Sequence, residues 1–103
     1  MSGVTNRFGI KAKYWEQILK LLSVYSEITD VLLFGSRAKG TYKPGSDIDL
    51  CVKGNGIDEQ QLLKLRTALD DLNLPWQIDL IHYEAISNEA LIEHINRVGI
   101  SLL

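Results

Sequence analysis

Two short stretches of the sequence combine residues that can bind phosphate with residues that can bind a metal ion. The first, Gly35–Gly40 (GSRAKG), follows an apolar run, and the second, Ser46–Leu50 (SDIDL), comes after a short loop. A strand that enters a glycine–serine turn and then a short helical turn exposes backbone N–H groups to an anion, and the serine hydroxyl adds a donor. Paired carboxylates bind divalent cations. Together the two stretches outline a site for a metal-bound nucleoside triphosphate.

The carboxylates of Asp47 and Asp49 are spaced for one face of a strand predicted over residues 47–52. Side chains two residues apart on a strand point the same way, so the two acids converge. Their mutual repulsion is relieved by a divalent cation, and hard oxygen ligands favour Mg²⁺ or Mn²⁺ over zinc. Taken alone, however, an Asp-x-Asp pair is more typical of a solvated strand edge or a turn.

A third acid, Asp79, is the only one inside the strand predicted over residues 76–82. Two-metal phosphoryl chemistry needs a bridging carboxylate and usually a further acid on the metal that activates the nucleophile. Because apolar residues flank Asp79, we expect its side chain to be buried and either metal-bound or paired with an arginine or lysine. The sequence leaves these two alternatives open.

The surrounding pattern predicts elements in the order α-β-β-α-β-α. Asp58 and Gln61 form a capping-box pair at the start of the middle helix, and Ser87 is expected to cap the last one.

The last helix has an apolar stripe that includes Leu102, and this stripe predicts an interface with a second copy or with a partner. Trp15 and Trp76 are expected to pack in the core or an interface. The predicted helices cover 13–25, 58–73 and 87–102, and the strands cover 31–34, 47–52 and 76–82.

The composition limits the classes of function. With 103 residues, 46% of them hydrophobic, we expect one domain over residues 1–103. Residues 1–12 are expected to be loose, apart from Phe8 and Ile10, which can pack against the body. A formal net charge of −2 gives no basic footprint for nucleic acid. Residues 1–10 hold no apolar signal-peptide core and no run reaches transmembrane length, so we expect a cytoplasmic protein without a membrane partner. The single cysteine, Cys51, is expected to serve packing.

The two motifs and the later Asp79 closely resemble the DNA polymerase beta-like nucleotidyltransferase superfamily, above all its minimal nucleotidyltransferase (MNT) branch. The resemblance implies an α+β nucleotidyltransferase fold, a small mixed sheet packed with helices. It also implies that Asp47 and Asp49 ligate both metals and that Asp79 completes the catalytic metal site. The positions implied for nucleotide binding are Gly35, Ser36, Arg37 and Lys39; the branch more often has arginine at the last of these.

The resemblance further implies a reaction and a partner. The reaction is Mg²⁺-dependent transfer of a nucleoside monophosphate, with ATP as the expected donor, to a hydroxyl acceptor. Members of the branch form complexes with small helical HEPN-type proteins, and several such pairs are toxin–antitoxin systems.

The alternative is a non-catalytic, nucleotide-binding antitoxin-like subunit that acts by contact with its partner. The complete set of Asp47, Asp49 and Asp79 favours catalysis, because contact alone does not require it. The sequence does not indicate the acceptor, the base preference or the oligomeric state.

Overall fold

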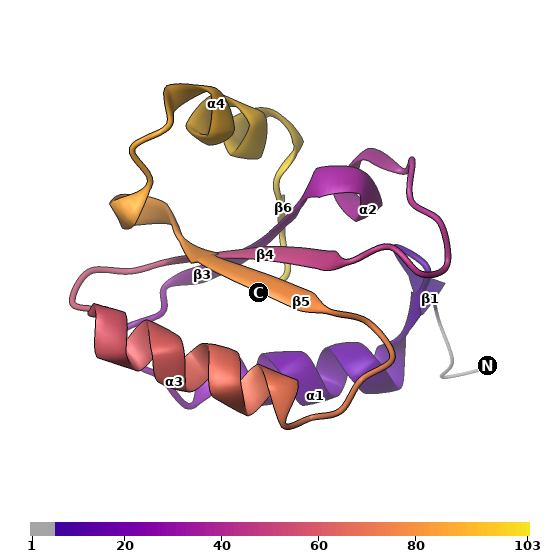
Figure 1. Ribbon diagram of the computed structural model, residues 1–103, viewed down its shortest axis with the longest axis horizontal. Helices are drawn as coiled ribbons and strands as arrows, with labels where there is room; N and C mark the ends of the chain where they lie inside the picture. The colour runs from indigo at the N-terminus through magenta and orange to yellow at the C-terminus, as the bar shows by residue number, and fades with distance from the viewer. Residues whose placement is uncertain (1–5) are drawn as a thin grey trace.

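A four-stranded mixed sheet forms the centre of the computed structural model, which describes residues 6–103 (Figure 1). The strands are β3 (Asp30–Phe34), β4 (Ile48–Lys53), β5 (Ile78–His82) and β6 (Ile100–Ser101). Their order in the sheet is β5-β4-β3-β6. β3 runs antiparallel to β4 and β6, whereas β4 and β5 are parallel. The predicted α+β class with a small mixed sheet is confirmed.

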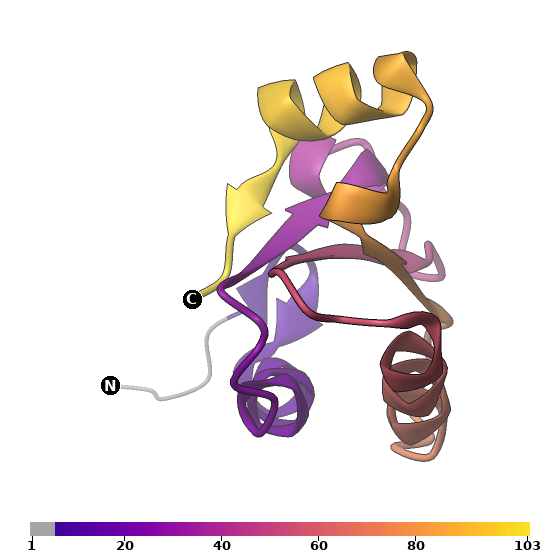
Figure 2. The ribbon, with the colours of Figure 1, turned by 90° about the vertical axis from the view of Figure 1, so that its left-hand side faces the viewer.

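Helices cover both faces of this sheet, as Figure 2 shows. The helices are α1 (Ala12–Ser23), α2 (Gly35–Lys39), α3 (Glu59–Asp70) and α4 (Glu89–Val98), with a 3₁₀ helix η1 (Tyr83–Ala85). α1 and α3 lie side by side on one face, and α4 lies on the other. The short α2 directly follows β3. Among residues 6–103, every helix is too short or too polar to span a lipid bilayer.

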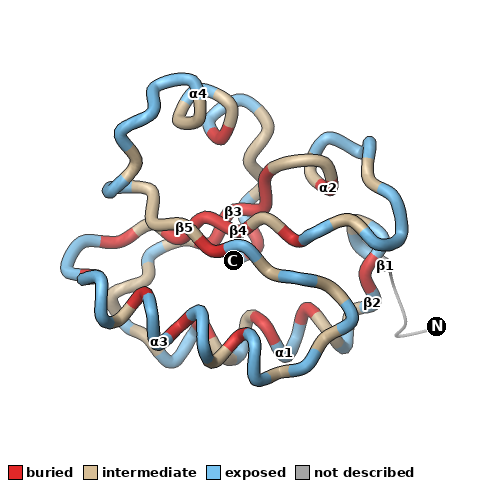
Figure 3. Tube along the Cα trace, in the orientation of Figure 1, coloured by how far each residue is buried: buried red, intermediate tan, exposed pale blue. Residues whose placement is uncertain are grey.

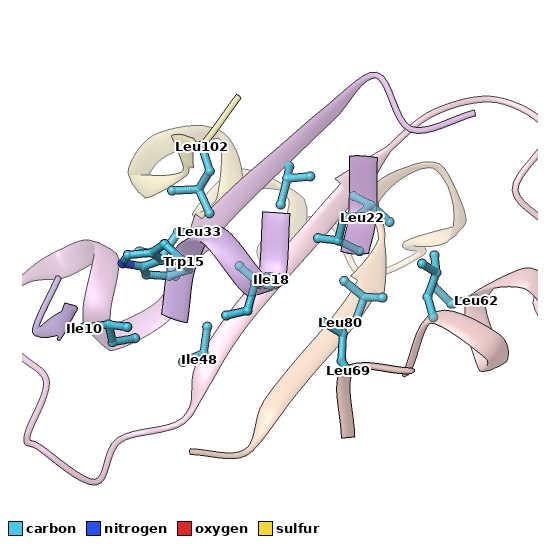
Figure 4. Packing of buried hydrophobic residues seen from close by; sticks show 14 of the residues in the cluster. Ile10, Trp15, Ile18, Leu22, Leu33, Ile48, Leu62, Leu69, Leu80 and Leu102 are labelled. Atoms are coloured by element: carbon cyan, nitrogen blue, oxygen red, sulfur yellow. The ribbon is translucent and has the colours of Figure 1, made fainter. Parts of the chain in front are cut away.

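The alternation of side chains along β4 decides which way its acid points. Ile48, Leu50 and Val52 are fully buried in the main core against α1 and α3, part of which Figure 4 shows. Cys51 is buried in a smaller cluster under α4, where burial raises the pKa of its thiol to about 12, so its role is packing. Because neighbours on a strand face opposite sides, Asp49 lies on the α4 side with Cys51. Figure 3 shows in red the buried positions along the central strands.

An N-terminal hairpin replaces part of the segment expected to be loose. β1 (Asn6–Arg7) pairs with β2 (Ile10–Lys11) through a two-residue turn, Phe8-Gly9, whose φ angles are both positive. Such turns match the twist of the paired strands. Ile10 is fully buried, and the Trp15 indole donates to the Arg7 carbonyl at 2.9 Å. The expectation of a loose segment is therefore wrong for residues 6–12, and residues 1–5 lie outside the described part.

The end of the chain also departs from the prediction. Asn88, not Ser87, caps α4, because its side chain accepts from the Leu91 N–H. The helix ends at Val98, so Leu102 does not extend its stripe. Instead β6 pairs with the outer edge of β3 and buries Leu102 in the main core. Pairing satisfies backbone groups that an open strand edge would leave without partners, which explains why the chain leaves the helix here.

We expect Asp58→Ala to lower the free energy of unfolding by about 1 kcal/mol. The predicted capping box is confirmed: the Asp58 carboxylate accepts from the Gln61 N–H at 2.8 Å, and the Gln61 side chain accepts from the Asp58 N–H at 3.1 Å. Urea denaturation measures the change. Asp71→Ala, at the opposite end of α3, removes an exposed carboxylate that caps no N–H group and should cost nothing. Equal losses for the two variants would contradict the capping role.

Candidate active site

Gly35, Asp49 and Asp79 lie in one row across the same end of the sheet. In the strand register, Asp49 pairs with Phe34 of β3 on one side and with Asp79 of β5 on the other. Gly35 follows Phe34 directly, and Asp47 precedes β4. The parallel pairing of β4 with β5 thus brings acids that are distant in sequence to neighbouring positions, next to the glycine–serine turn.

The turn and the Asp49 carboxylate are in direct contact. Gly35 has φ +72°, and a Cβ atom at this position would collide with Oδ2 of Asp49. Only glycine allows both this backbone conformation and this close approach. Half-buried Ser36 follows in the first turn of α2, and no side chain caps that helix. The predicted anion-binding turn and the predicted metal ligand therefore belong to one site.

The electrostatic environment of Asp49 shows how closely the acids approach. Burial, then the charges of Asp79 and Asp47, then a side-chain hydrogen bond with Asp79 raise the pKa of Asp49 to about 6. No basic side chain is among these causes. Burial and the two neighbouring carboxylates therefore all favour the protonated form of Asp49.

Asp79 is not buried, contrary to the sequence expectation. Its side chain is exposed because β5 is an edge strand and α4 does not cover this end of it. Among residues 6–103, no arginine or lysine forms an ion pair with it. Its protein donor is the amide of Gln77, at 3.5 Å. Asp47 is also exposed.

The donor set fits a hard divalent cation. The three acids offer carboxylate oxygens, which are the ligands that Mg²⁺ prefers. A cation would relieve the mutual repulsion that, after burial, raises the pKa of Asp49. Among the described residues, no three Asp, Glu, His or Cys side chains lie close enough together to form a complete metal site. Asp49, together with the exposed carboxylates of Asp47 and Asp79, would hold the cation.

In metal-free protein, Asp49 should make folding less favourable as the pH rises. Its folded-state pKa of about 6 lies above the ordinary value of 3.8, so the folded protein holds this proton more tightly than the unfolded chain. The resulting stabilisation is fully present below pH 3.8 and is lost as the pH rises through 6. We expect a loss on the order of 1 kcal/mol, because solvent screens this half-buried group. Urea denaturation in EDTA across this range, compared with Asp49→Asn, measures it; identical pH dependence in both proteins would contradict the prediction.

The two basic residues of the turn differ in exposure. Arg37 points inward and is 1% exposed, with its guanidinium bonded to backbone carbonyls and not open to a phosphate. Burial lowers its pKa. Lys39 is exposed at the C-terminal end of α2. The position of Arg37 therefore gives no support to the predicted contact with the nucleotide, because its side chain leaves α2 towards the interior of the protein.

A cavity that no motif predicts opens beside the carboxylates. Its volume is about 880 Å³, and it lies between β5 and the C-terminal half of α3, with Asp49 and Asp79 in its wall. Its other polar lining includes Arg66, Asn73 and Gln77. Arg66 donates two hydrogen bonds to the Leu80 carbonyl of β5, at 2.8 and 3.0 Å. The sequence carries no signal for these residues, since they meet the site only through the packing of α3 on the sheet.

Family comparison decides the class of the protein. A sequence model of the family described as "Polymerase beta, Nucleotidyltransferase" matches residues 16–103, a span that contains the glycine–serine turn and all three acids. The chain belongs to this family. This match confirms the resemblance to polymerase beta-like nucleotidyltransferases that the motifs indicated, and with it the nucleotidyltransferase fold.

This nucleotidyltransferase is similar to a protein adenylyltransferase and to solved structures of toxin–antitoxin proteins. A probable protein adenylyltransferase, MntA, from Haemophilus influenzae is 36% identical over 60 residues, or 57% of this chain and 53% of that protein. A crystal structure of a toxin–antitoxin with AMP-PNP matches with a TM-score of 0.72 at 26% identity, over 85% of this chain and 71% of that one. The tri-AMPylated Shewanella oneidensis HEPN toxin in complex with MNT antitoxin matches with a TM-score of 0.68 at 22% identity, over 88% and 70%.

These matches place the nucleotidyltransferase in the MNT branch. The alignment with the curated Haemophilus relative spans about half the length of that protein. The likeness to the Shewanella complex, at 22% identity, concerns the fold. The family match, taken with the similarity to MntA and to the toxin–antitoxin structure with AMP-PNP, fits a nucleotidyltransferase of the MNT type.

Proposed function

We propose that this nucleotidyltransferase transfers AMP from ATP to a hydroxyl group of a small helical HEPN-type partner, with Mg²⁺ or Mn²⁺ as the metal. The contact between Gly35 and Asp49 carries the proposal, because it joins an anion-binding turn to a carboxylate in one site. The similarity to a protein adenylyltransferase and to a toxin–antitoxin with AMP-PNP supports the nucleotide and the kind of partner.

Each part of the site has a role in this reaction. Gly35 and Ser36 would bind the β- and γ-phosphates through backbone N–H groups and the hydroxyl, and exposed Lys39 would add positive charge. The three carboxylates would hold the metal. When bound, Mg²⁺ neutralises charge on the phosphates and favours loss of the acceptor's proton.

The arrangement of the site also indicates the side from which the acceptor would approach the α-phosphorus. The acceptor oxygen forms a bond to the α-phosphorus, the bond from that phosphorus to the bridging oxygen breaks, and pyrophosphate leaves while the hydroxyl proton passes to a carboxylate or to water. In an in-line displacement, the entering and leaving oxygens lie on opposite sides of the phosphorus. Because Gly35 lies on the β3 side of Asp49, the acceptor would enter from the β5 side, where Asp79 lines the cavity.

The test is transfer of label from α-labelled ATP to the helical partner protein in the presence of Mg²⁺. We expect label on the partner with the wild-type protein and none in EDTA. If the wild-type protein labels no partner, the proposed function is wrong. If Asp49→Asn neutralises the partner as well as the wild type does, the non-catalytic alternative is favoured instead.

A further inference from the structure

The burial of Arg37 is unusual for a charged side chain. Its exposed fraction is 1%, and among residues 6–103 no carboxylate forms an ion pair with it. Its partners are neutral: the guanidinium lies 5.0 Å from the Tyr42 ring and 5.6 Å from the Trp76 ring. Moving a charge out of water is costly, and an apolar side chain would fill such a space without that cost. A structural purpose specific to the guanidinium is therefore indicated.

The hydrogen bonds of Arg37 show what that purpose is. Nη1 donates to the Phe8 carbonyl at 2.8 Å, and Nη2 donates to the Pro44 carbonyl at 3.1 Å. Both Nε and Nη2 donate to the Ser46 carbonyl, at 3.2 and 2.9 Å. One side chain thus ties α2 to the N-terminal hairpin and to the loop that leads into β4.

The Ser46 carbonyl belongs to the peptide bond that continues into Asp47. Asp47 lies just outside β4, whose first residue is Ile48, so the sheet ladder does not include it. The loop before it has its own bonds, including Trp76 Nε1 to the Pro44 carbonyl at 2.9 Å and the Lys43 N–H to the Ser46 hydroxyl at 2.9 Å. Arg37 is the link from this loop to the helix that begins with the glycine–serine turn.

We propose that Arg37 is a positioning residue for nucleotidyl transfer and does not contact the nucleotide. Through the carbonyls of Pro44 and Ser46 it holds the backbone that presents Asp47 at a set distance from Gly35 and Ser36. It thereby fixes the position of the carboxylate of Asp47 relative to the phosphate-binding turn. The inference rests on the proposed function, because it assigns Arg37 a part in that reaction.

Arginine suits this role better than lysine. Its planar fork of N–H donors reaches three carbonyls at once while its faces lie against aromatic rings, whereas an ammonium group has no such planar fork. All three guanidinium nitrogens of Arg37 donate hydrogen bonds, and two aromatic rings flank the group. Lysine at position 37 should therefore fail to replace arginine even though it keeps the charge.

The test compares Arg37→Lys and Arg37→Ala with Arg97→Ala, which removes an exposed arginine of α4 paired only with Glu93. The kcat for transfer to the partner should fall about 10²-fold in both Arg37 variants, while KM for ATP should change less than about threefold. Arg97→Ala should behave like the wild type. If Arg37 instead touched phosphate, KM would rise about tenfold or more and lysine would restore much of it. That result, or an unchanged kcat in folded variants, would overturn the proposal.

A binding measurement separates this inference from the proposed function. Mn²⁺ affinity, followed by electron paramagnetic resonance without any acceptor, should weaken about tenfold in Arg37→Lys if Asp47 is displaced. This readout decides the role of Arg37 even if no partner is labelled. An unchanged Mn²⁺ affinity in the folded Arg37→Lys protein would contradict it.

If both Arg37 variants fail to fold, Tyr42→Leu provides the second test, because it removes one ring from the guanidinium and leaves the hydrogen bonds. We expect a lower kcat with unchanged KM for ATP. An unchanged kcat, or a rise in KM alone, would overturn the proposal.

Discussion

Asp49→Asn is expected to lower the rate of nucleotidyl transfer by at least about 10³-fold, because it removes the negative charge of a proposed metal ligand. Asparagine preserves the size of the side chain, so the fold should be unaffected. At neutral pH the variant should be at least as stable as the wild type, since burial and the nearby Asp79 and Asp47 raise the pKa of Asp49 to about 6. A residue proposed as a metal ligand is thus unfavourable for the metal-free fold.

Single-turnover transfer assays and urea denaturation on the same preparations measure both effects. Asp58→Asn is the matched control, because it makes the same chemical change at the N-cap of α3, where asparagine caps as well as aspartate. It should keep activity and stability. A loss of less than about tenfold for Asp49→Asn would contradict its role as a metal ligand.

Gly35→Ala is expected to reduce transfer by about 10²-fold or more and to lower the free energy of unfolding by about 1–3 kcal/mol. The backbone at Gly35 has φ +72°, where an L side chain is strained, and the added Cβ would collide with Oδ2 of Asp49. The carboxylate must therefore move away from the position in which it neighbours the turn. Transfer assays and urea denaturation again measure the outcome.

Two further variants make the cause of the Gly35→Ala defect visible. Gly45→Ala lies in the loop before β4, where an added Cβ meets nothing within 4 Å, and it should leave activity and stability unchanged. Combining Gly35→Ala with Asp49→Ala removes the colliding carboxylate, so the stability loss from Gly35→Ala should be smaller in that background. The same loss in both backgrounds would assign the defect to backbone strain alone and would contradict the collision.

Features that depend on neighbouring residues could be predicted from the amino-acid sequence. Asp58 and Gln61 lie within one helical turn, so their capping box could be predicted and is confirmed. The apolar run before Gly35 predicts the buried strand β3, and the glycine–serine turn follows it as expected. The motifs were sufficient to indicate the family. The catalytic, metal-binding and nucleotide-binding roles of individual residues stay predictions.

Features that depend on segments distant in the sequence became visible once the strands and helices were packed. The parallel pairing of β4 with β5 sets Asp79 beside Asp49, and the edge position of β5 leaves Asp79 exposed although its neighbours are apolar. Arg37 stands among phosphate-binding candidates in the sequence, yet its donors reach carbonyls from the hairpin and the loop. Local spacing gives only the direction in which a side chain leaves the backbone; which groups it then meets depends on how the strands and helices pack.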